Sequence, residues 1–491
     1  MSALTALGEA ARARVAEARR REGEDELLAR ARARGPARDV WARLRAAPRP
    51  ALVAEFKRAS PSAGAIAAHA DPVRTARAYA RAGAAMVSVL TEPTAFGGRL
   101  EDLERVRAAV DLPVLQKDFV VDPYQIVQAR AAGADAVLLI VALVGRALGD
   151  LMAQARALGM EALVEAHTAE EVALAVEAGA RLIGVNNRDL ATLRVDTKTA
   201  LSLIPLVPTD RFALAESGLV SPADVRRAVR AGADGVLVGE YLMRSAAPEA
   251  AARALRQAGR TYVKVCGVIR REDAQQAVEA GADAVGFVFA PSPRRVDAGT
   301  ARALGEGLEA ERVGVFASTP LPEVVETARR AGLTGVQLHD ADWQPEEVRA
   351  LAREGLDVLA AVAPGPDAVE RARAALAAGA LPLVDARLGA RPDGRGGHLD
   401  MAQAARLGAG VRRLVLAGGL DPDNVAAAVA AVDPYGVDVS SGVEEGRPGW
   451  KDAARVRAFV AAARRHWRES AEGWEKAAAG GREEGDGYAA G

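Results

Sequence analysis

A repeating pattern of hydrophobic and polar residues runs along nearly the whole chain. A helix-like stretch that ends in an Ala-Gly pair is followed by an uninterrupted apolar run, as in residues 81–90, 131–140, 230–239 and 279–289. Glycine just beyond a helix adopts the left-handed conformation without a Cβ penalty and so ends the helix. The apolar runs do not alternate with polar residues, which is typical of strands buried on both faces. The pattern therefore predicts parallel strands that alternate with helices.

Eight such strands are predicted in each half of the chain. In the first half they are expected at residues 52–56, 86–90, 113–116, 136–141, 161–165, 182–186, 211–216 and 235–239. In the second half they are expected at residues 261–265, 284–289, 312–316, 335–338, 357–362, 381–385, 413–417 and 436–440. Eight strand–helix units close a (β/α)8 barrel. The predicted fold class is therefore α/β, with two tandem TIM barrels. Two open doubly wound sheets are the alternative, although neither half has a GxGxxG motif after its first strand.

The two barrels are expected to occupy residues 1–258 and 259–467, with almost no linker between them. Residues 1–46 are rich in Arg, Glu and Ala and are predicted to form one or two helices ahead of the first barrel. Residues 468–491 lose the apolar periodicity and become rich in Gly and Glu, so a disordered tail is predicted there.

The composition argues against several classes of function. The 491 residues include 64 basic and 65 acidic residues, a formal charge of −1, so a general nucleic-acid binder is not expected. No apolar run approaches the length of a membrane span and no secretion signal is recognised, so we expect a cytoplasmic location without a membrane partner. The single cysteine, Cys266, and the five scattered histidines do not have the spacing of metal ligands, so no metal site is expected.

Polar residues gather where the predicted strands of the first barrel end. They are Glu55, Lys57, Lys117, Glu165, Asn186 and Glu216. TIM barrels carry their chemistry at the carboxyl ends of the strands, so these side chains are expected at one barrel mouth. Only six of the 64 basic residues are lysine, and the pKa of a lysine, unlike that of an arginine, can be tuned for proton transfer. We interpret the set as an acid–base site; ion pairs that merely close the barrel top are the alternative.

Glycine turns follow the seventh and eighth strands of both barrels, at residues 215–218, 238–240, 417–422 and 440–444. TIM barrels bind phosphate at this position through backbone N–H groups and a helix N-terminus. One such turn is a weak signal, but the pair occurs twice. Both barrels are therefore predicted to bind phosphorylated small molecules.

The second barrel has its own set of polar residues. They are Lys264, Cys266, Gln337, His339 and Asp385 at strand ends, with Arg294 in the loop after the second strand. A lone cysteine is usually a small core residue. Here a neighbouring lysine is expected to lower the pKa of the thiol. Cys266 as base and Asp385 as acid is the predicted pair.

Long motifs in the two halves resemble two enzyme families. The segments AEFKRASPSAG (54–64) and LQKDFVVDPYQI (115–126) resemble indole-3-glycerol-phosphate synthase. The segments VKVCGVIRREDA (263–274) and VDVSSGVE (437–444) resemble phosphoribosylanthranilate isomerase. The order, synthase first and isomerase second, is similar to that of the bifunctional enzymes of bacterial tryptophan biosynthesis. The resemblance covers about residues 1–466 and implies two successive reactions, in which the second barrel supplies the substrate of the first.

For the first barrel, the resemblance implies ring closure with loss of CO₂ and water to give indole-3-glycerol phosphate. Lys117 would protonate the substrate's carbonyl oxygen, and Glu165 would assist loss of the hydroxyl and of the final proton. Lys57 would hold the substrate carboxylate and share the acid work, with Glu55 beside it as a further catalytic residue. The other matching residues are Asn186, Arg188, Glu216 and Ser217 for substrate binding and Gly218 and Gly239 for phosphate binding.

For the second barrel, the resemblance implies an Amadori isomerisation of N-(5-phosphoribosyl)anthranilate to the carboxyphenylamino-deoxyribulose phosphate. Asp385 would protonate the ring oxygen, Cys266 would remove the C2′ proton, and Arg294 would contact the anthranilate carboxylate. The matching phosphate-binding residues are Gly418, Gly419, Ser440, Ser441 and Gly442. No cofactor is implied. The expected partners are small phosphorylated anthranilate substrates, and the chain is expected to be a monomer.

One segment of the second barrel departs from the family. Residues 385–401 (DARLGARPDGRGGHLDM) are longer than the family's loop, with His398 and Met401 where aromatic residues are common. Asp340 also replaces a common glycine. One alternative is therefore that the second barrel is a structural domain with a decayed site. A second alternative is a regulator that binds phosphosugars without catalysis.

Overall fold

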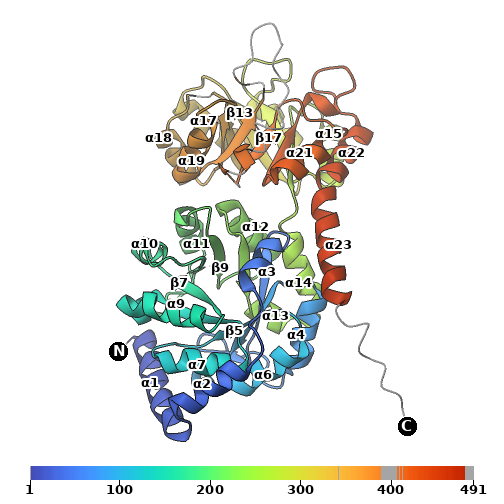
Figure 1. Ribbon diagram of the computed structural model, residues 1–491. Coiled ribbons are helices and arrows are strands. Elements are labelled where there is room, and N and C mark those ends of the chain that lie inside the picture. The colour runs from blue at the N-terminus through green and yellow to red at the C-terminus, as the bar shows by residue number, and fades with distance from the viewer. Residues whose placement is uncertain are drawn as a thin grey trace, which may run out of the picture. The chain divides into compact units, whose positions relative to one another are not determined.

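The computed structural model describes residues 2–340, 342–386, 388, 406–408, 410–411 and 413–480. Within these residues the chain forms two closed barrels of eight parallel strands each (Figure 1). The first comprises β1 (Ala51–Phe56), β4 (Met86–Leu90), β5 (Val114–Lys117), β6 (Ala136–Ile140), β7 (Glu161–Ala166), β8 (Leu182–Asn186), β9 (Phe212–Glu216) and β10 (Gly235–Val238). The second comprises β11 (Tyr262–Cys266), β12 (Ala284–Val288), β13 (Glu311–Phe316), β14 (Gly335–Leu338), β15 (Asp357–Val362), β16 (Leu381–Asp385), β17 (Val415–Ala417) and β18 (Gly436–Val439). The prediction of two tandem TIM barrels is confirmed, and the alternative of two open sheets is wrong.

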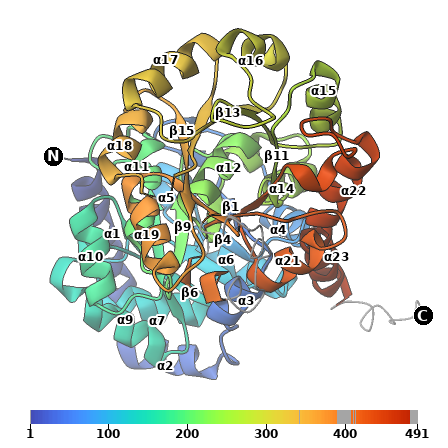
Figure 2. The ribbon, with the colours of Figure 1, turned by 90° about the horizontal axis from the view of Figure 1, so that it is seen from above.

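Helices follow the strands in both barrels, and in the second they encircle the strands when the barrel is viewed end-on (Figure 2). Three helices precede the first barrel: α1 (Ala3–Arg21), α2 (Glu24–Ala33) and α3 (Val40–Ala46). Those of the first barrel are α4 (Pro72–Arg81), α5 (Pro93–Phe96), α6 (Leu100–Ala109), α7 (Pro123–Ala132), α8 (Val141–Val144), α9 (Leu148–Ala157), α10 (Ala169–Glu177), α11 (Lys198–Leu203), α12 (Pro222–Ala231), α13 (Glu240–Arg244) and α14 (Pro248–Gln257). Those described in the second are α15 (Arg271–Glu279), α16 (Ala298–Gly305), α17 (Leu321–Ala331), α18 (Pro345–Arg353), α19 (Ala368–Ala378), α21 (Val425–Val432) and α22 (Ala453–Ala463), followed by α23 (Arg465–Gly480).

The recurring Ala-Gly-Ala-Asp motif has a structural explanation. Its glycine ends the helix in the left-handed region, as at Gly133, where φ is 96°. Its aspartate, one or two residues before the next strand, accepts a hydrogen bond from the first residues of the preceding strand. Asp135 accepts from the N–H of Val114 at 2.9 Å, and Asp283 accepts from the N–H of Val263 at 3.0 Å. The motif therefore links consecutive strands by a hydrogen bond at the end of the barrel opposite the predicted sites.

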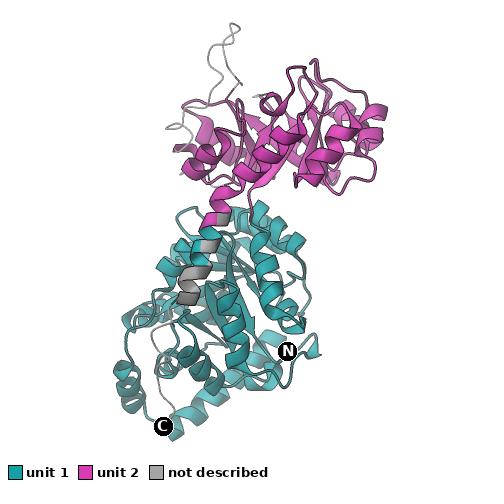
Figure 3. Ribbon diagram, turned by 90° about the vertical axis from the view of Figure 1, so that its right-hand side faces the viewer, with its two compact units in different colours: residues 1–259, 470–491 teal, residues 260–469 magenta. Residues whose placement is uncertain are grey.

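The chain divides into two compact units, residues 1–259 with 470–491 and residues 260–469 (Figure 3). Most strand residues in both units are buried, which accounts for the uninterrupted apolar runs in the sequence. In the part of the chain that the structure describes, no helix is both long enough and apolar enough to cross a membrane.

Helix α23 continues beyond residue 467, where the sequence pattern predicted disorder to begin. Its Ala471 is buried, and the Trp474 Nε1 donates a hydrogen bond to the carbonyl of Gly83 at 2.9 Å. The guanidinium carbon of Arg43 lies 3.9 Å from the centroid of the same indole ring. These contacts stabilise the segment through residues distant in sequence, which local periodicity does not reveal. Residues 481–491 of the predicted tail lie outside the described residues.

Candidate active sites

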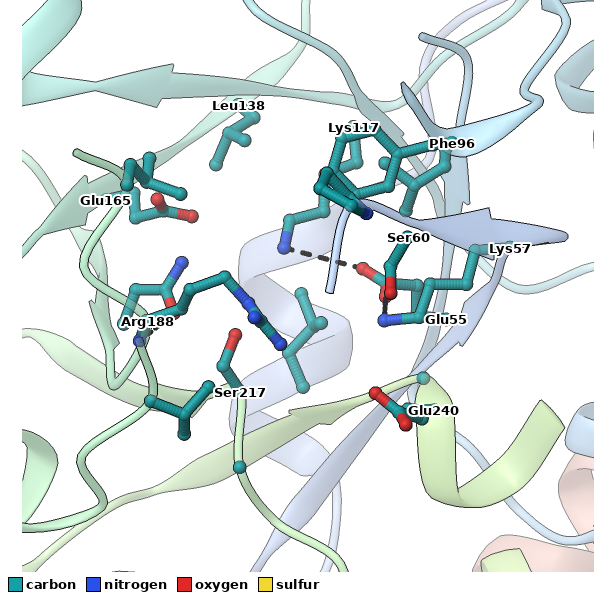
Figure 4. A pocket seen from close by; sticks show the side chains of 18 of the residues that line it. Glu55, Lys57, Ser60, Phe96, Lys117, Leu138, Glu165, Arg188, Ser217 and Glu240 are labelled. Atoms are coloured by element: carbon teal, nitrogen blue, oxygen red, sulfur yellow. Dashed lines mark hydrogen bonds and ion pairs between the residues drawn. The ribbon is translucent and has the colours of Figure 1, made fainter. Parts of the chain in front are cut away.

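The mouth of the first barrel contains a cavity of about 360 Å³ (Figure 4). Nine of the residues predicted for this site line it: Glu55, Lys57, Lys117, Glu165, Asn186, Arg188, Ser217, Gly218 and Gly239. Figure 4 shows that Lys117 and Glu165 point into the same space from different strands. The tenth predicted residue, Glu216, is completely buried and contacts Lys117 from behind the cavity wall.

Lys117 lies between two carboxylates. Its Nζ is 3.1 Å from Oε2 of Glu216 and 3.4 Å from Oε2 of Glu55. The other oxygen of Glu55 is 2.9 Å from the Nζ of Lys57, so one carboxylate connects the two lysines. The arrangement follows from the strand register, because β1 and β9 are both neighbours of β10 and all strand ends lie on one rim.

The charges around Lys117 determine its protonation state. Burial alone would lower the pKa of Lys117, but Glu216, Glu55 and Glu165 outweigh it and raise this pKa above the ordinary value. Burial raises the pKa of Glu216 to about 7, with further increases from Glu165 and Glu55 and an opposing effect of Lys117. Burial also acts to raise the pKa of Glu55, but Lys57 and Lys117 bring it below the ordinary value. Lys117 is thus held as an ammonium group, which suits a proton donor.

Two glycines create the space that these carboxylates occupy. A Cβ on Gly184, in the middle of β8, would collide with Oε1 of Glu216. A Cβ on Gly239, directly after β10, would collide with Oε1 of Glu55. Gly239 was predicted as a phosphate-binding residue, and it also makes room for the carboxylate that connects the lysines.

The rest of the cavity wall is largely apolar. Phe96, Phe119, Leu138 and Ile140 line it, together with Leu7 from helix α1. A flat aromatic ring of a substrate can pack against such a wall while its charged groups face the lysines.

The turn after β9 is backbone-strained. Ser217 has a φ of 61°, which is unusual for a residue other than glycine, and Gly218 follows at 70°. The Asn187 Nδ2 donates to the carbonyl of Ser217 at 2.9 Å and so supports this conformation. Nearby, the Nη1 of Arg188 donates to the Ser62 hydroxyl at 2.9 Å.

The mouth of the second barrel contains a separate cavity of about 270 Å³. Of the residues predicted for this site, Lys264 alone does not line the cavity; those that do are Cys266, Arg294, Gln337, His339, Asp385, Gly418, Gly419, Ser440, Ser441 and Gly442. The predicted acid and base therefore face one space, which also contains the two glycine turns.

Lys264 is completely buried and binds other partners besides the thiol. Its Nζ is 2.9 Å from Oδ2 of Asp438 and 2.9 Å from Oε1 of Gln337. Burial raises the pKa of Cys266, and the opposing effect of Lys264 is too weak to reverse it. Lys264 acts in the expected direction, but desolvation of Cys266, which is 7 % exposed, dominates and keeps the thiol pKa above its ordinary value.

Arg294 is held by a buried carboxylate. Its Nε and Nη2 are each 2.7 Å from one oxygen of Glu444. The Nζ of Lys451, which is 1 % exposed, lies 2.9 Å from the same Glu444 and 3.0 Å from the carbonyl of Ser440. Burial acts to raise the pKa of Glu444, but Arg294 and Lys451 bring it to about 2. The carboxylate thus stays ionised and fixes the guanidinium.

The candidate acid, Asp385, packs closely against one of the glycine turns. Asp385 Oδ2 is 3.9 Å from the Nε2 of His339, and a Cβ on Gly418, where φ is 84°, would collide with Asp385. A Cβ on Gly442 would likewise collide with the carbonyl of Leu420. Only glycine allows these approaches, which leave backbone groups exposed to a ligand. The loop with His398 and Met401 lies outside the described residues.

Some residues of both sites were not found by the sequence argument. Asp118 follows Lys117 and accepts from the Nη2 of Arg14 at 2.6 Å, which ties helix α1 to the first mouth. His167 lies 3.4 Å from Glu165. Glu444 and Lys451 support Arg294 in the second barrel. Lys451 could have been noticed because lysine is scarce in this chain, but it does not lie at the end of a strand. Glu444 and Arg294 are far apart in the sequence, so no local pattern indicates that they pair.

Comparison with known proteins agrees with this geometry. Residues 4–255 match the family model of indole-3-glycerol phosphate synthase, and residues 263–462 match that of N-(5'phosphoribosyl)anthranilate (PRA) isomerase. A multifunctional tryptophan biosynthesis protein of Schizosaccharomyces pombe is 37% identical over 461 residues, which are 84% of this chain and 59% of that protein. The chain therefore spans less than two thirds of the length of that relative.

Relatives of single barrels are also found. An indole-3-glycerol phosphate synthase of Kineococcus radiotolerans is 54% identical over 242 residues, which are 48% of this chain and 88% of that protein. The crystal structure of a phosphoribosyl anthranilate isomerase from Thermus thermophilus is 38% identical, with a TM-score of 0.36, and the match covers 41% of this chain and 98% of that one. The chain belongs to the indole-3-glycerol phosphate synthase family through its first barrel and to the phosphoribosylanthranilate isomerase family through its second.

Proposed function

We propose that the chain catalyses two successive steps of tryptophan biosynthesis in the cytoplasm. The second barrel isomerises N-(5-phosphoribosyl)anthranilate, and the first barrel closes the ring of the product to give indole-3-glycerol phosphate. The observation that carries the proposal is that the acid and base of each reaction line one cavity in each unit. The proposed form of the chain is a monomer.

In the second barrel, the substrate phosphate is placed at the two glycine turns and its anthranilate carboxylate at Arg294. Asp385 protonates the furanose ring oxygen, so that the ring opens to a Schiff base. Cys266 then removes the C2′ proton and leaves the enamine that becomes the ketone. Because burial raises the pKa of Cys266, the thiol holds its proton at neutral pH. The active form has that proton on Asp385 instead, a transfer that leaves the net charge unchanged.

In the first barrel, the ammonium of Lys117 protonates the carbonyl oxygen while the aromatic carbon attacks the carbonyl carbon. Loss of CO₂ restores the electron pair to the ring. Glu165 assists departure of the hydroxyl as water and takes the final proton. Lys57, held by Glu55 at 2.9 Å, is placed to bind the substrate carboxylate, and the Ser217–Gly218 turn is placed to bind the phosphate.

A coupled assay on the full chain tests this proposal. Lys117→Ala should lower ring closure by at least about 100-fold while substrate binding is retained. Cys266→Ser or Asp385→Asn should abolish isomerisation and spare ring closure of supplied intermediate. A wild-type chain that does not consume N-(5-phosphoribosyl)anthranilate would support the alternative of a decayed second barrel. Full activity of Lys117→Ala would support the binding regulator.

A further inference from the structure

His167, at the end of β7, lies between two carboxylates. Its Nε2 is 3.4 Å from Oε1 of Glu165, and its Nδ1 is 3.5 Å from Oε2 of Glu171 on helix α10. The backbone N–H of His167 also donates to Glu171 at 2.7 Å, which fixes the direction of that carboxylate. Among the described residues, neither the Nε2 of His167 nor Oε1 of Glu165 has a hydrogen-bond partner with good geometry. Two buried polar atoms thus face each other.

The two residues lie on the walls of different cavities. Glu165 lines the substrate cavity, where its side chain is only 2% exposed. His167 lines a second cavity of about 670 Å³ together with Thr168, Glu171, Asp189 and Thr199. Its side chain is 14% exposed, so the imidazole reaches solvent where Glu165 does not. His167 therefore lies between Glu165 and the second cavity.

The proposed ring closure needs a proton from outside. The substrate carboxylate leaves as CO₂ and the hydroxyl leaves as water, so an ionised substrate takes up one proton per turnover. A substrate that fills the first cavity covers Lys117 and Lys57. A proton that enters while the substrate is bound therefore has to come by another route.

We propose that His167 supplies this proton to Glu165 from the second cavity. The Nε2–H bond breaks and an O–H bond forms on Glu165, which passes the proton to the departing hydroxyl as water is released. The proton that Glu165 then takes from the ring carbon returns to Lys117, which gave its own proton to the carbonyl oxygen, so one proton is taken up per turnover. Solvent in the second cavity then reprotonates the neutral ring. His167 acts through Glu165 and is a positioning and relay residue. This inference rests on the proposed ring closure.

The charges that face His167 favour its protonated form. They are Glu165 on β7, Glu171 on α10, Glu216 on β9 and Asp189 in the loop after β8. Burial acts to lower the pKa of His167, but Glu171, Glu165 and Glu216 outweigh it and raise this pKa above the ordinary value. These charges therefore favour the imidazolium donor, which is lost as the pH rises through the raised pKa.

Ring closure by the full chain, given the carboxyphenylamino-deoxyribulose phosphate, tests the relay. His167→Gln retains an N–H donor but does not titrate. Its kcat should fall about 100-fold with little change in KM, and the alkaline decline expected of the wild type should be absent. The matched control is Thr199→Ala, which alters the second cavity without touching His167 and should behave as the wild type. Isomerisation should be unchanged in both variants.

A second variant covers the case in which His167→Gln does not fold. In His167→Ala, added imidazole should enter the second cavity and restore kcat, with a pH dependence that follows the imidazolium. A wild-type kcat and pH profile in His167→Gln would overturn the relay, as would a folded His167→Ala that imidazole does not restore. A wild-type chain that cannot close the ring would instead overturn the proposed function.

Discussion

Lys117 and Cys266 are both buried at barrel mouths, and their surroundings raise both pKa values for different physical reasons. Three carboxylates outweigh the burial of Lys117 and stabilise its charged form. At Cys266, burial outweighs one lysine that is already bound to Asp438 and Gln337, and it stabilises the neutral form. Both groups consequently hold their protons at neutral pH. Lys117 can therefore act directly as an acid, whereas Cys266 has to lose its proton before it can act as a base.

The thiol of Cys266 provides a direct measurement, because it is the only thiol in the chain. Thiolate is the form that reacts with iodoacetamide, so alkylation should rise about tenfold per pH unit until the pH exceeds the ordinary pKa of a thiol. Lys264→Met should raise that pKa further and slow alkylation at a given pH, since Lys264 opposes the effect of burial. Glutathione under the same conditions is the control. A Cys266 that titrates below glutathione would contradict the dominance of burial.

Arg294 gives a second test at this scale. Its Nε and Nη2 each donate one hydrogen bond to Glu444, so the Nη1 group and the second N–H of Nη2 can donate to a substrate carboxylate. Lysine cannot bind Glu444 at two points and the substrate at a third. Arg294→Lys should therefore raise the isomerase KM about tenfold, the effect of one charge-assisted hydrogen bond, with kcat nearly unchanged. Steady-state kinetics separate the two constants, and a lower kcat at unchanged KM would assign Arg294 to the chemical step instead.

At the scale of elements, the predicted strands agree with the observed ones to within two residues at each end. Burial on both faces produces an uninterrupted apolar run, and a left-handed glycine marks the end of several preceding helices, such as α7 and α12, so both signals are local. The strand-end residues of both sites were predictable for the same reason. The pairing of His167 with Glu165 and of Glu444 with Arg294 depends on which elements pack together. The local sequence pattern does not indicate this packing.

Strand β8 determines the position of one carboxylate of the first site. Gly184 occupies its centre, where a Cβ would collide with the carboxylate of Glu216. Gly184→Ala should displace Glu216 from Lys117, reduce ring closure, and lower the free energy of unfolding by about 1–3 kcal/mol. The comparison is Gly149→Ala in helix α9, where a Cβ meets nothing within 4 Å. That change should be neutral or stabilise by up to about 1 kcal/mol.

Denaturant unfolding and the ring-closure assay measure both effects of Gly184→Ala. Unchanged activity together with lower stability would show that Glu216 tolerates displacement. The contact of Glu216 with Lys117 would then not be required for catalysis.

At the scale of the whole molecule, each unit has its own buried core. Residues such as Val87, Val137 and Val236 belong to the first core, and Val263, Val336 and Val437 belong to the second. Each unit also contains a complete set of predicted catalytic groups in its own cavity. We therefore expect catalysis at one site to require no residue from the other unit.

Because each unit has its own set of predicted catalytic groups, we expect two variants, each inactivated at a different site, to complement each other in a mixture. Lys117→Ala retains the isomerase site, and Asp385→Asn retains the ring-closure site, so the intermediate made by one chain can diffuse to the other. An equimolar mixture should convert N-(5-phosphoribosyl)anthranilate to indole-3-glycerol phosphate at roughly half the steady-state rate of the same total wild-type chain, because independent sites add. A lag should precede that rate while the free intermediate accumulates. Each variant alone should form the indole product at no more than about one hundredth of the wild-type rate. A mixture that is no faster than either variant, although both chains retain their partial reactions, would show that the intermediate has to pass within one chain.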